Sequence, residues 1–459
     1  MLSQLLQPEI IDLLKERKLS TLKEVLNEWD PADLAALINQ VSEKERVIIF
    51  RLLNEELATD TFEFLEVEQQ IKLIKAMGNG EVASILNEMA PDDRTALFEE
   101  LPSSAVKQLV RMLSSEERKV AQTLLGYPED SVGRLMTPDY IAVKSDWTIA
   151  ESIKYIRENG EDSETLNIIF VVDESGKLID DLKIRELILA EPESKISDLM
   201  DKNFVALHVT DDQETAVDVF KQYDRIALPV IDKNGLLLGI VTVDDVLDVA
   251  EEEATEDIQK IGGLTALEES YSTISIFQMM KKRAGWLSLL FIGEMFTATA
   301  MSYFEFEISK AVVLALFVPL IISSGGNSGS QASTLVIRAL SVGEIKLKDW
   351  FFVMKREIIS GLILGSILAI LGFLRISVWQ TSSHIYGVHW LLIALTVSIS
   401  LLGVVLWGTL AGSMLPIILK KLGADPAVAS APLVATLVDV TGLVIYFSVA
   451  IIVLSGTLL

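Results

Sequence analysis

The sequence predicts a multidomain membrane protein: an all-α transmembrane domain with five spans, preceded by a cytosolic α-superhelical N domain and a duplicated α/β unit. Three observations support this prediction. The last 183 residues contain five apolar stretches long enough to cross a hydrocarbon core of about 30 Å. The first 130 residues show turn or polar residues at intervals of 12 residues. Between these regions, one pattern returns after about 60 residues.

The charge is divided unevenly along the 459 residues. The net charge is −26, but residues 277–459 carry 12 basic and 8 acidic side chains, whereas residues 1–276 carry 27 and 57. The acidic part argues against nucleic acid as a partner, because phosphates would be repelled. The absence of cysteine excludes disulfides and thiolate chemistry. The three histidines lie in no nucleophile motif and no Walker-type string is present, so we expect no enzyme.

The five apolar stretches set the membrane topology. We expect no signal peptide at Met1–Ile10, and therefore a cytoplasmic first half. Basic clusters at Lys281–Arg283, within 338–356 and at Lys420–Lys421 fall in alternate loops, which places the N-terminus inside and the C-terminus outside a cell (inner) membrane. The predicted spans are Ala284–Tyr303, Ala311–Leu340, Ile358–Leu374, Trp390–Pro416 and Pro432–Leu454.

A polar run of small residues, Gly325–Thr334, interrupts the second span. We expect the helix to break there, because such backbone facing lipid would be poorly satisfied. The run must then face protein or water. Close helix packing through small residues is one interpretation, and a water-filled path is the one we favour.

Asp439 is an acidic residue within the fifth predicted span. An ionised carboxylate near mid-membrane costs about 2.5–3.5 kcal/mol on insertion scales, so it is rarely kept without a function. At helical spacing, Asp439 shares a face with Pro432, Ala435 and Gly442. Oxygen ligands suit hard cations, and Mg²⁺ usually keeps several of its waters. The sequence therefore favours a sparse cation site here.

Two alternatives remain open at this stage. Asp439 could instead accept a hydrogen bond from a neighbouring hydroxyl, Thr436 or Thr441. Glu294 in the first span has a similar but weaker claim to the path, because it could pair with a polar residue of the second span.

The first 130 residues predict short helices stacked as a superhelix, an architecture that usually provides interaction surfaces. Apolar residues at helical spacing lie between the regular marks, and several marks are capping residues followed by an acid. The marks are Asp30-Pro31, Ser42, Asn54, Glu66, Gly78, Ala90-Pro91, Pro102 and Ser114.

Residues 131–196 and 197–250 each read as helix, β-branched strand, turn, second strand and helix. Phe170–Leu178 is echoed by Leu228–Leu236, and the pair resembles tandem CBS modules. An acidic helical segment over 251–277 then leads into the transmembrane domain, 278–459. Its carboxylates repel one another along one helix face, and a cation among them would remove that repulsion.

The whole chain resembles MgtE-type magnesium channels, which are related to the SLC41 carriers. The order of parts matches: acidic helical N domain, two CBS modules, connecting "plug" helix and five spans. The matching strings are Val241–Val246, Ala254–Ile258, Pro319-Leu320 with Gly325–Ala332, and Pro432–Gly442.

The resemblance implies a homodimeric Mg²⁺ channel whose pore lies on the two-fold axis, closed when cytosolic Mg²⁺ is high. Asp439 would hold hydrated Mg²⁺ in the pore, with Ala435 and Asn327 nearby. It also implies ATP as a ligand of the CBS pair, although no string here marks a nucleotide site. The regulatory Mg²⁺ ligands would be Asp92, Asp93, Glu214, Asp224, Asp245, Asp248, Glu253, Glu256, Asp257 and Asp425.

Three choices are left open by the sequence. Either Asp92 or Asp93 could be the ligand that faces Asp245. A transporter of another divalent cation, Mn²⁺ or Co²⁺, would use the same residue types. A CBS-regulated anion channel is less compatible with an acidic residue in the membrane. A scaffold protein without transport activity would not explain why Asp439 lies in a membrane span.

Overall fold

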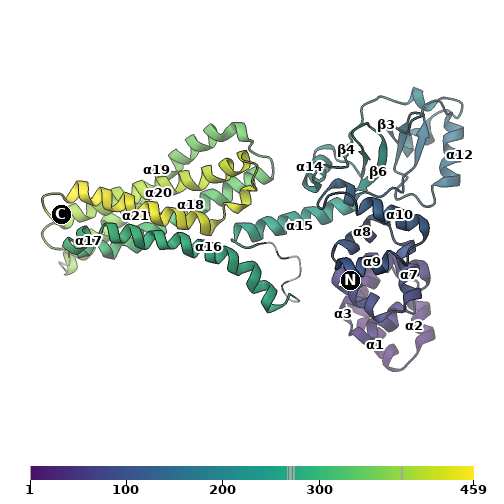
Figure 1. Cartoon of the computed structure of the whole chain (residues 1–459), viewed down its shortest axis with the longest axis horizontal. Coiled ribbons are helices and arrows are strands. Elements are labelled where there is room, and N and C mark those ends of the chain that lie inside the picture. The colour runs from purple at the N-terminus through teal and green to yellow at the C-terminus, as the bar shows by residue number, and fades with distance from the viewer. Residues whose placement is uncertain (1, 266, 268–270, 272–273, 384–385, 459) are drawn as a thin grey trace. The chain divides into compact units, whose positions relative to one another are not determined.

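The computed structural model describes residues 2–265, 267, 271, 274–383 and 386–458. The chain forms two compact units, Met1–Glu251 and Glu252–Leu459, and each is described by itself (Figure 1). The boundary between the units falls inside one helix, α15, which runs over Val243–Ile261.

The first part of unit 1 is a stack of short helices, as predicted. Each of the eight regular marks in the sequence is the N-cap of a helix, from Asp30 of α3 to Ser114 of α10. Several caps accept a backbone N–H of the first turn, as Asn54 does from Leu57 at 2.8 Å. The helices are α1 Leu2–Lys15, α2 Leu19–Leu26, α3 Pro31–Gln40, α4 Glu43–Phe50, α5 Glu55–Glu63, α6 Val67–Ala76, α7 Asn79–Glu88, α8 Pro91–Glu99, α9 Ser103–Leu109 and α10 Ser115–Leu124.

The true repeat of this stack is 24 residues, a pair of helices. In every second helix a long side chain donates to the carbonyl oxygen eight residues earlier, near the end of the preceding helix. These bonds satisfy carbonyls that a helix end leaves without an intrahelical partner. They run from Arg46 to Ile38 at 3.1 Å, Gln70 to Phe62 at 2.8 Å, Arg94 to Leu86 at 2.9 Å and Arg118 to Val110 at 3.0 Å.

The second part of unit 1 contains two similar α/β modules, which confirms the predicted duplication. Each has a three-stranded sheet in which the first two strands are parallel and the last two antiparallel. Gly176 and Gly235 make the equivalent turns with φ of +82° and +84°. The elements are α11 Val132–Leu135, β1 Ala142–Lys144, α12 Ile149–Asn159, β2 Ile168–Val172, β3 Leu178–Lys183, α13 Ile184–Leu189, η1 Ile196–Asp198, β4 Leu207–His208, α14 Gln213–Tyr223, β5 Ala227–Ile231 and β6 Leu237–Thr242.

Among its described residues, unit 2 contains five helices that are long and apolar enough to cross a membrane, one for each predicted span. α18, α19, α20 and α21 pack together, whereas α16 packs along α21 and has no buried residue. The helices are α16 Ile276–Tyr303, α17 Glu305–Lys310, α18 Val318–Ser341, α19 Trp350–Ser383, α20 Trp390–Lys421 and α21 Ala431–Leu454, with short 3-10 turns η2 Val312–Phe317, η3 Leu347–Asp349 and η4 Pro426–Val428.

The predicted break in the second span is wrong, because α18 runs without interruption through the glycine-rich run. Gly325 and Gly329 lie against Gly408 and Gly412 of α20. A Cβ atom at Gly412 would overlap the carbonyl oxygen of Gly329, and one at Gly408 that of Gly325. The glycines therefore allow close helix packing, which was the interpretation we favoured less, while intrahelical hydrogen bonds satisfy the backbone.

This crossing predicts that Gly412→Ala destabilises unit 2. The added methyl would meet backbone that cannot rotate away, and overpacking of this kind costs about 1–3 kcal/mol. We expect a lower thermal unfolding temperature of the full chain in detergent. Gly285→Ala is the matched control, because open space surrounds its added methyl. Equal unfolding temperatures of the two variants would contradict the close crossing.

Candidate functional site

Asp439 lies half-buried on α21, beside two positions with little or no side chain. A Cβ atom at Gly326 of α18 would lie 3.6 Å from Asp439 Oδ1 and 3.5 Å from the Cβ of Ala435. The glycine-rich run thus has two uses: Gly325 and Gly329 contact α20, while Gly326 leaves space beside the carboxylate.

The hydroxyl alternative for Asp439 does not occur. Thr436 donates to the carbonyl oxygen of Pro432 at 3.0 Å, and Thr441 donates to that of Leu437 at 2.7 Å. Thr441 also accepts a hydrogen bond from Trp407 Nε1 at 2.7 Å. In the described part of the chain, no side chain donates to Asp439. The carboxylate is therefore free to bind a ligand.

Asn327, the other predicted pore residue, is exposed in the single chain. Its Nδ2 donates weakly to Ser323 Oγ of the same helix at 3.4 Å. It follows Gly326 directly, so it lies at the level of the Asp439 site on α18.

Unit 1 brings predicted carboxylates from two separate segments together. Asp92 and Asp93 lie in the first turn of α8, and Asp245 lies in the first turn of α15. Asp92 is only 7% exposed, and its Oδ1 has no hydrogen-bond partner among the described residues. The negative charge of Asp245 acts on both Asp92 and Asp93. Asp92 and Asp93 are therefore both close enough to Asp245 for its charge to act on them.

The environment of these carboxylates disfavours negative charge. Burial and then the charges of Asp245 and Asp93 raise the pKa of Asp92 well above its ordinary value. Burial and the charge of Glu63 raise the pKa of Asp93 to about 8. Burial raises the pKa of Asp245 to about 7, although its Oδ2 accepts a hydrogen bond from Thr242 at 2.6 Å. A divalent cation would offset the same repulsion.

Two further acids contribute to this group and were missed in the sequence. Glu63 at the end of α5 accepts the backbone N–H of Ala90 at 2.8 Å, and burial raises its pKa to about 7. Glu164, between α12 and β2, acts electrostatically on Asp92, Asp93 and Asp245. Both are far from α8 and α15 in the sequence, and no local pattern indicates them.

The other predicted regulatory residues of unit 1 are more exposed. Glu214 lies in the first turn of α14, Asp224 is the left-handed C-cap of that helix with φ of 48°, and Asp248 lies on α15. Among the described residues, no three histidine, aspartate or glutamate side chains lie close enough to hold one metal ion. Any Mg²⁺ here would keep most of its waters.

Around Asp425 in unit 2, a lysine occupies the place where we expected a metal ion. Lys260 Nζ lies 2.6 Å from Glu256 Oε1 and 2.7 Å from Asp425 Oδ2. Burial lowers the pKa of Lys260, but hydrogen bonds and attraction from the two carboxylates outweigh burial and raise it. Asp257 accepts a hydrogen bond from Ser341 at 3.0 Å. Glu253 lies on the same helix and is partly buried.

These contacts fix the end of α15 on unit 2. Ile261 packs with Ile337 of α18 and with Ala427 and Ala429, which follow α20. The sequence showed Lys260 four residues after Glu256, a spacing that favours an ion pair, but the bond to Asp425 joins residues 165 apart.

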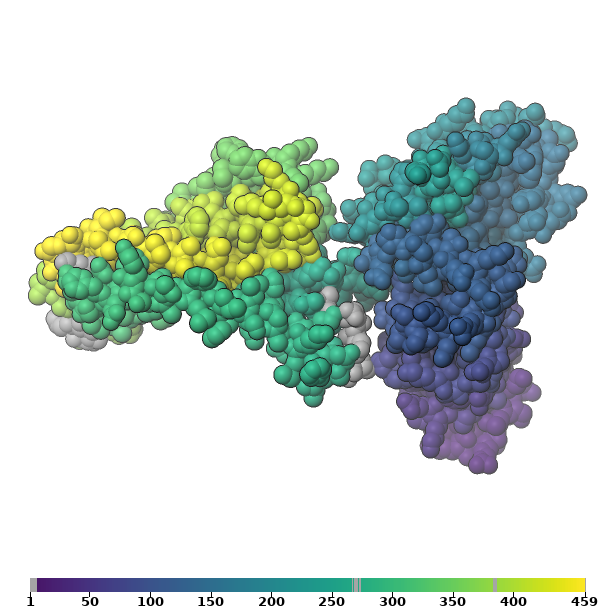
Figure 2. Space-filling model, in the orientation of Figure 1, coloured from purple at the N-terminus to yellow at the C-terminus, as the bar shows by residue number. Residues whose placement is uncertain are grey.

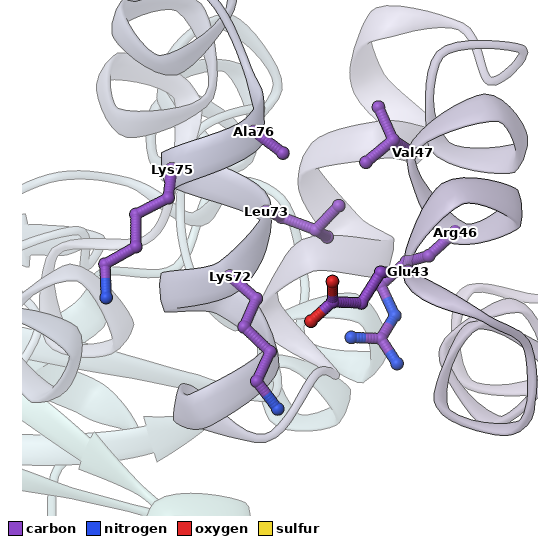
Figure 3. A pocket seen from close by; sticks show the side chains of 7 residues that line it. All are labelled: Glu43, Arg46, Val47, Lys72, Leu73, Lys75 and Ala76. Carbon is purple, nitrogen blue, oxygen red and sulfur yellow. The ribbon is translucent and has the colours of Figure 1, made fainter.

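A cavity of about 280 Å³ between α4 and α6 is unrelated to the predicted sites (Figure 3). Its charged lining is mainly basic, and Arg46 is already bonded to Ile38 and Gln69. It is lined by Glu43, Arg46, Val47, Lys72, Leu73, Lys75 and Ala76. None of the predicted metal ligands faces it.

Comparison with known families covers most of the chain. Residues 318–449 match the family MgtE, described as divalent cation transporter. Residues 29–130 match the MgtE intracellular N domain, and residues 132–193 and 196–252 match the CBS domain.

Named relatives match nearly end to end. The chain is 37% identical over 443 residues to the magnesium transporter MgtE of Thermus thermophilus, covering 96% of each chain. It is 33% identical over 441 residues to the Bacillus subtilis protein of the same name, again covering 96% of each. A crystal structure of the cytosolic domain of the Mg²⁺ channel MgtE in complex with ATP matches 53% of this chain and 99% of its own, with 34% identity and a TM-score of 0.51.

The raised pKa values in unit 1 predict that, in a chelating buffer, its packing weakens as pH rises. Below about pH 4 these carboxyls are protonated in folded and unfolded chains alike. Between there and about pH 8, the folded unit keeps protons that the unfolded chain has lost, so stability falls with pH. Limited proteolysis of residues 1–251, normalised to an unfolded substrate, should be faster at about pH 8 than at about pH 6. Asp93→Asn should flatten this dependence, and a slower rate at the higher pH would contradict it.

Proposed function

Because the chain belongs to the MgtE family of divalent cation transporters, we propose that it is a Mg²⁺ channel of the inner cell membrane, closed by cytosolic Mg²⁺. The observation that carries the proposal is Asp439, a carboxylate within an apolar helix that no described side chain pairs or bonds. Gly326 and Ala435 put no bulky or charged side chain beside it, and Mg²⁺ is usually held by only one or two carboxylates together with its waters.

One chain supplies too few ligands for an ion path, and we propose a homodimer whose second copy supplies another Asp439 across a two-fold axis. Asn327 is exposed in the single chain, and no residue of α16 is fully buried there. Unit 1 also exposes large apolar side chains on its CBS modules: Ile188 is 66% exposed, Leu189 78% and Leu247 64%. Such surfaces favour burial against a partner.

For gating, we propose that Mg²⁺ neutralises the carboxylates between α8 and the start of α15. Without the ion, Asp92, Asp93 and Asp245 either repel one another or must take up protons. With it, the two helices pack. A shift from 1:99 to 99:1 takes about 5.5 kcal/mol, which several weak sites can supply together. Glu214, Asp224 and Asp248 would bind further ions at the exposed surface, and α15 would carry the change toward the pore.

The remaining features follow the same proposal. The N-terminal domains would be cytoplasmic, and with basic loops on the same side of the membrane the C-terminus would lie outside. The CBS pair would bind ATP, as in the related cytosolic domain whose structure contains it. Mn²⁺ or Co²⁺ as the transported ion is the alternative, and flux measurements with each cation separate the two.

Asp439→Ala should abolish Mg²⁺ flux into vesicles that contain the full chain and a Mg²⁺-sensitive dye. The substitution removes the carboxylate but little volume, so the protein should remain folded in detergent. Glu344→Ala, which removes an exposed acid in the loop after α18, is the control and should leave flux unchanged. Unchanged flux in the Asp439 variant would refute the pore assignment.

Mg²⁺ should slow proteolysis of residues 1–251 in the full chain, because the ion replaces repulsion with bridging contacts. The double variant Asp92→Asn, Asp93→Asn should be resistant without Mg²⁺ and respond less to it. Glu191→Gln, Glu193→Gln, in the exposed loop after α13, serves as a doubly neutralised control. Protection that does not rise with Mg²⁺ in the unmodified chain would exclude the sensor.

A further inference from the structure

Glu294 is a second acidic residue within a membrane-crossing helix, α16. It is exposed in the single chain, and the structure gives it no hydrogen bond or ion pair within the described residues. α16 lies along one side of unit 2 (Figure 2). A carboxylate facing hydrocarbon would cost about 2.5–3.5 kcal/mol, so this part of α16 must face water or a second copy.

The contact between α16 and α21 places Glu294 near Asp439. A Cβ atom at Gly293 would lie 2.8 Å from Thr436 Cγ2, so the two helices touch at this point. Thr436 lies one turn before Asp439, on the same side of α21. Accordingly, the charge of Glu294 acts directly on Asp439. Pairing of Glu294 with the polar run of α18, the alternative left open by the sequence, does not occur.

A hydroxyl group on α16 also favours the entry of water near Glu294. Thr297, one turn after Glu294 on α16, has a buried hydroxyl oxygen without a hydrogen-bond partner among the described side chains and backbone. Buried polar atoms of this kind are usually satisfied by water. Glu294 therefore lies one helical turn from a second polar group of α16 that has no partner among the described residues.

We propose that Glu294 is a specificity-determining residue of the ion path, which with Asp439 attracts a hydrated divalent cation and disfavours monovalent ones. The inference rests on the proposed function and adds a residue to it. Two nearby negative charges repel until a cation lies between them, and a doubly charged ion gains twice the Coulomb energy of a singly charged one. At mid-membrane this difference is little screened by solvent salt.

The test compares Glu294→Gln with the unmodified full chain in dye-loaded vesicles. We expect Mg²⁺ flux to persist, with the half-saturating Mg²⁺ concentration raised about three- to tenfold and inhibition by Na⁺ increased. Glu305→Gln, an exposed acid just after the same helix, is the matched control and should match the unmodified chain. Where Glu294→Gln does not assemble, Glu294→Met, which suits an apolar surface, replaces it with the same expected outcome.

The outcomes separate this inference from the proposal beneath it. Loss of flux in Asp439→Ala with no change in Glu294→Gln overturns the role of Glu294 alone. Flux that survives Asp439→Ala overturns both. Cross-linking of the variant in the vesicles measures association of copies. If the Glu294→Gln copies cross-link less while the half-saturating Mg²⁺ concentration is unchanged, Glu294 belongs to an interface between copies. That result would overturn its role in ion selection.

Discussion

Negative charge held away from water is the constraint on which the rest of the molecule depends. In unit 2 it is concentrated at Asp439, within an apolar helix, and in unit 1 at Asp92, whose Oδ1 has no partner among the described residues. Burial alone would favour protonation of such groups. A cation offers a second way to lower the same free energy, which makes these places sensitive to the ion that the protein is proposed to carry.

Small residues of α18 and α20 determine how closely other side chains approach Asp439. α18 and α20 approach closely through Gly325, Gly329, Gly408 and Gly412, and this rigid contact leaves Gly326 facing Asp439. Because the backbone of α18 stays helical, its polar groups are satisfied and no irregular loop is needed at membrane depth. One sequence run therefore combines tight packing against α20 with a glycine, Gly326, beside the carboxylate of Asp439.

Local patterns predicted most of the fold, and long-range contacts account for what was missed. The eight N-caps and five spans follow from capping chemistry and apolar length, both readable within a few residues. The break at Gly325–Thr334 was wrong because composition does not show which neighbour lies against a glycine. The 24-residue period escaped notice because its marker is not one residue type: it is glutamine at Gln70 and arginine at the other three positions.

The same limit applies to the charged sites, and Lys260 shows its consequence. The sequence indicated that the acids of residues 251–277 repel one another, but only the fold shows that an ammonium, Lys260, already lies between Glu256 and Asp425. A divalent ion at this point would have to displace a lysine, whereas between α8 and α15 it would displace only protons. On the proposed gating mechanism, the carboxylates of unit 1 would therefore respond more to Mg²⁺, whereas Lys260 already holds the end of α15 against Asp425 of unit 2.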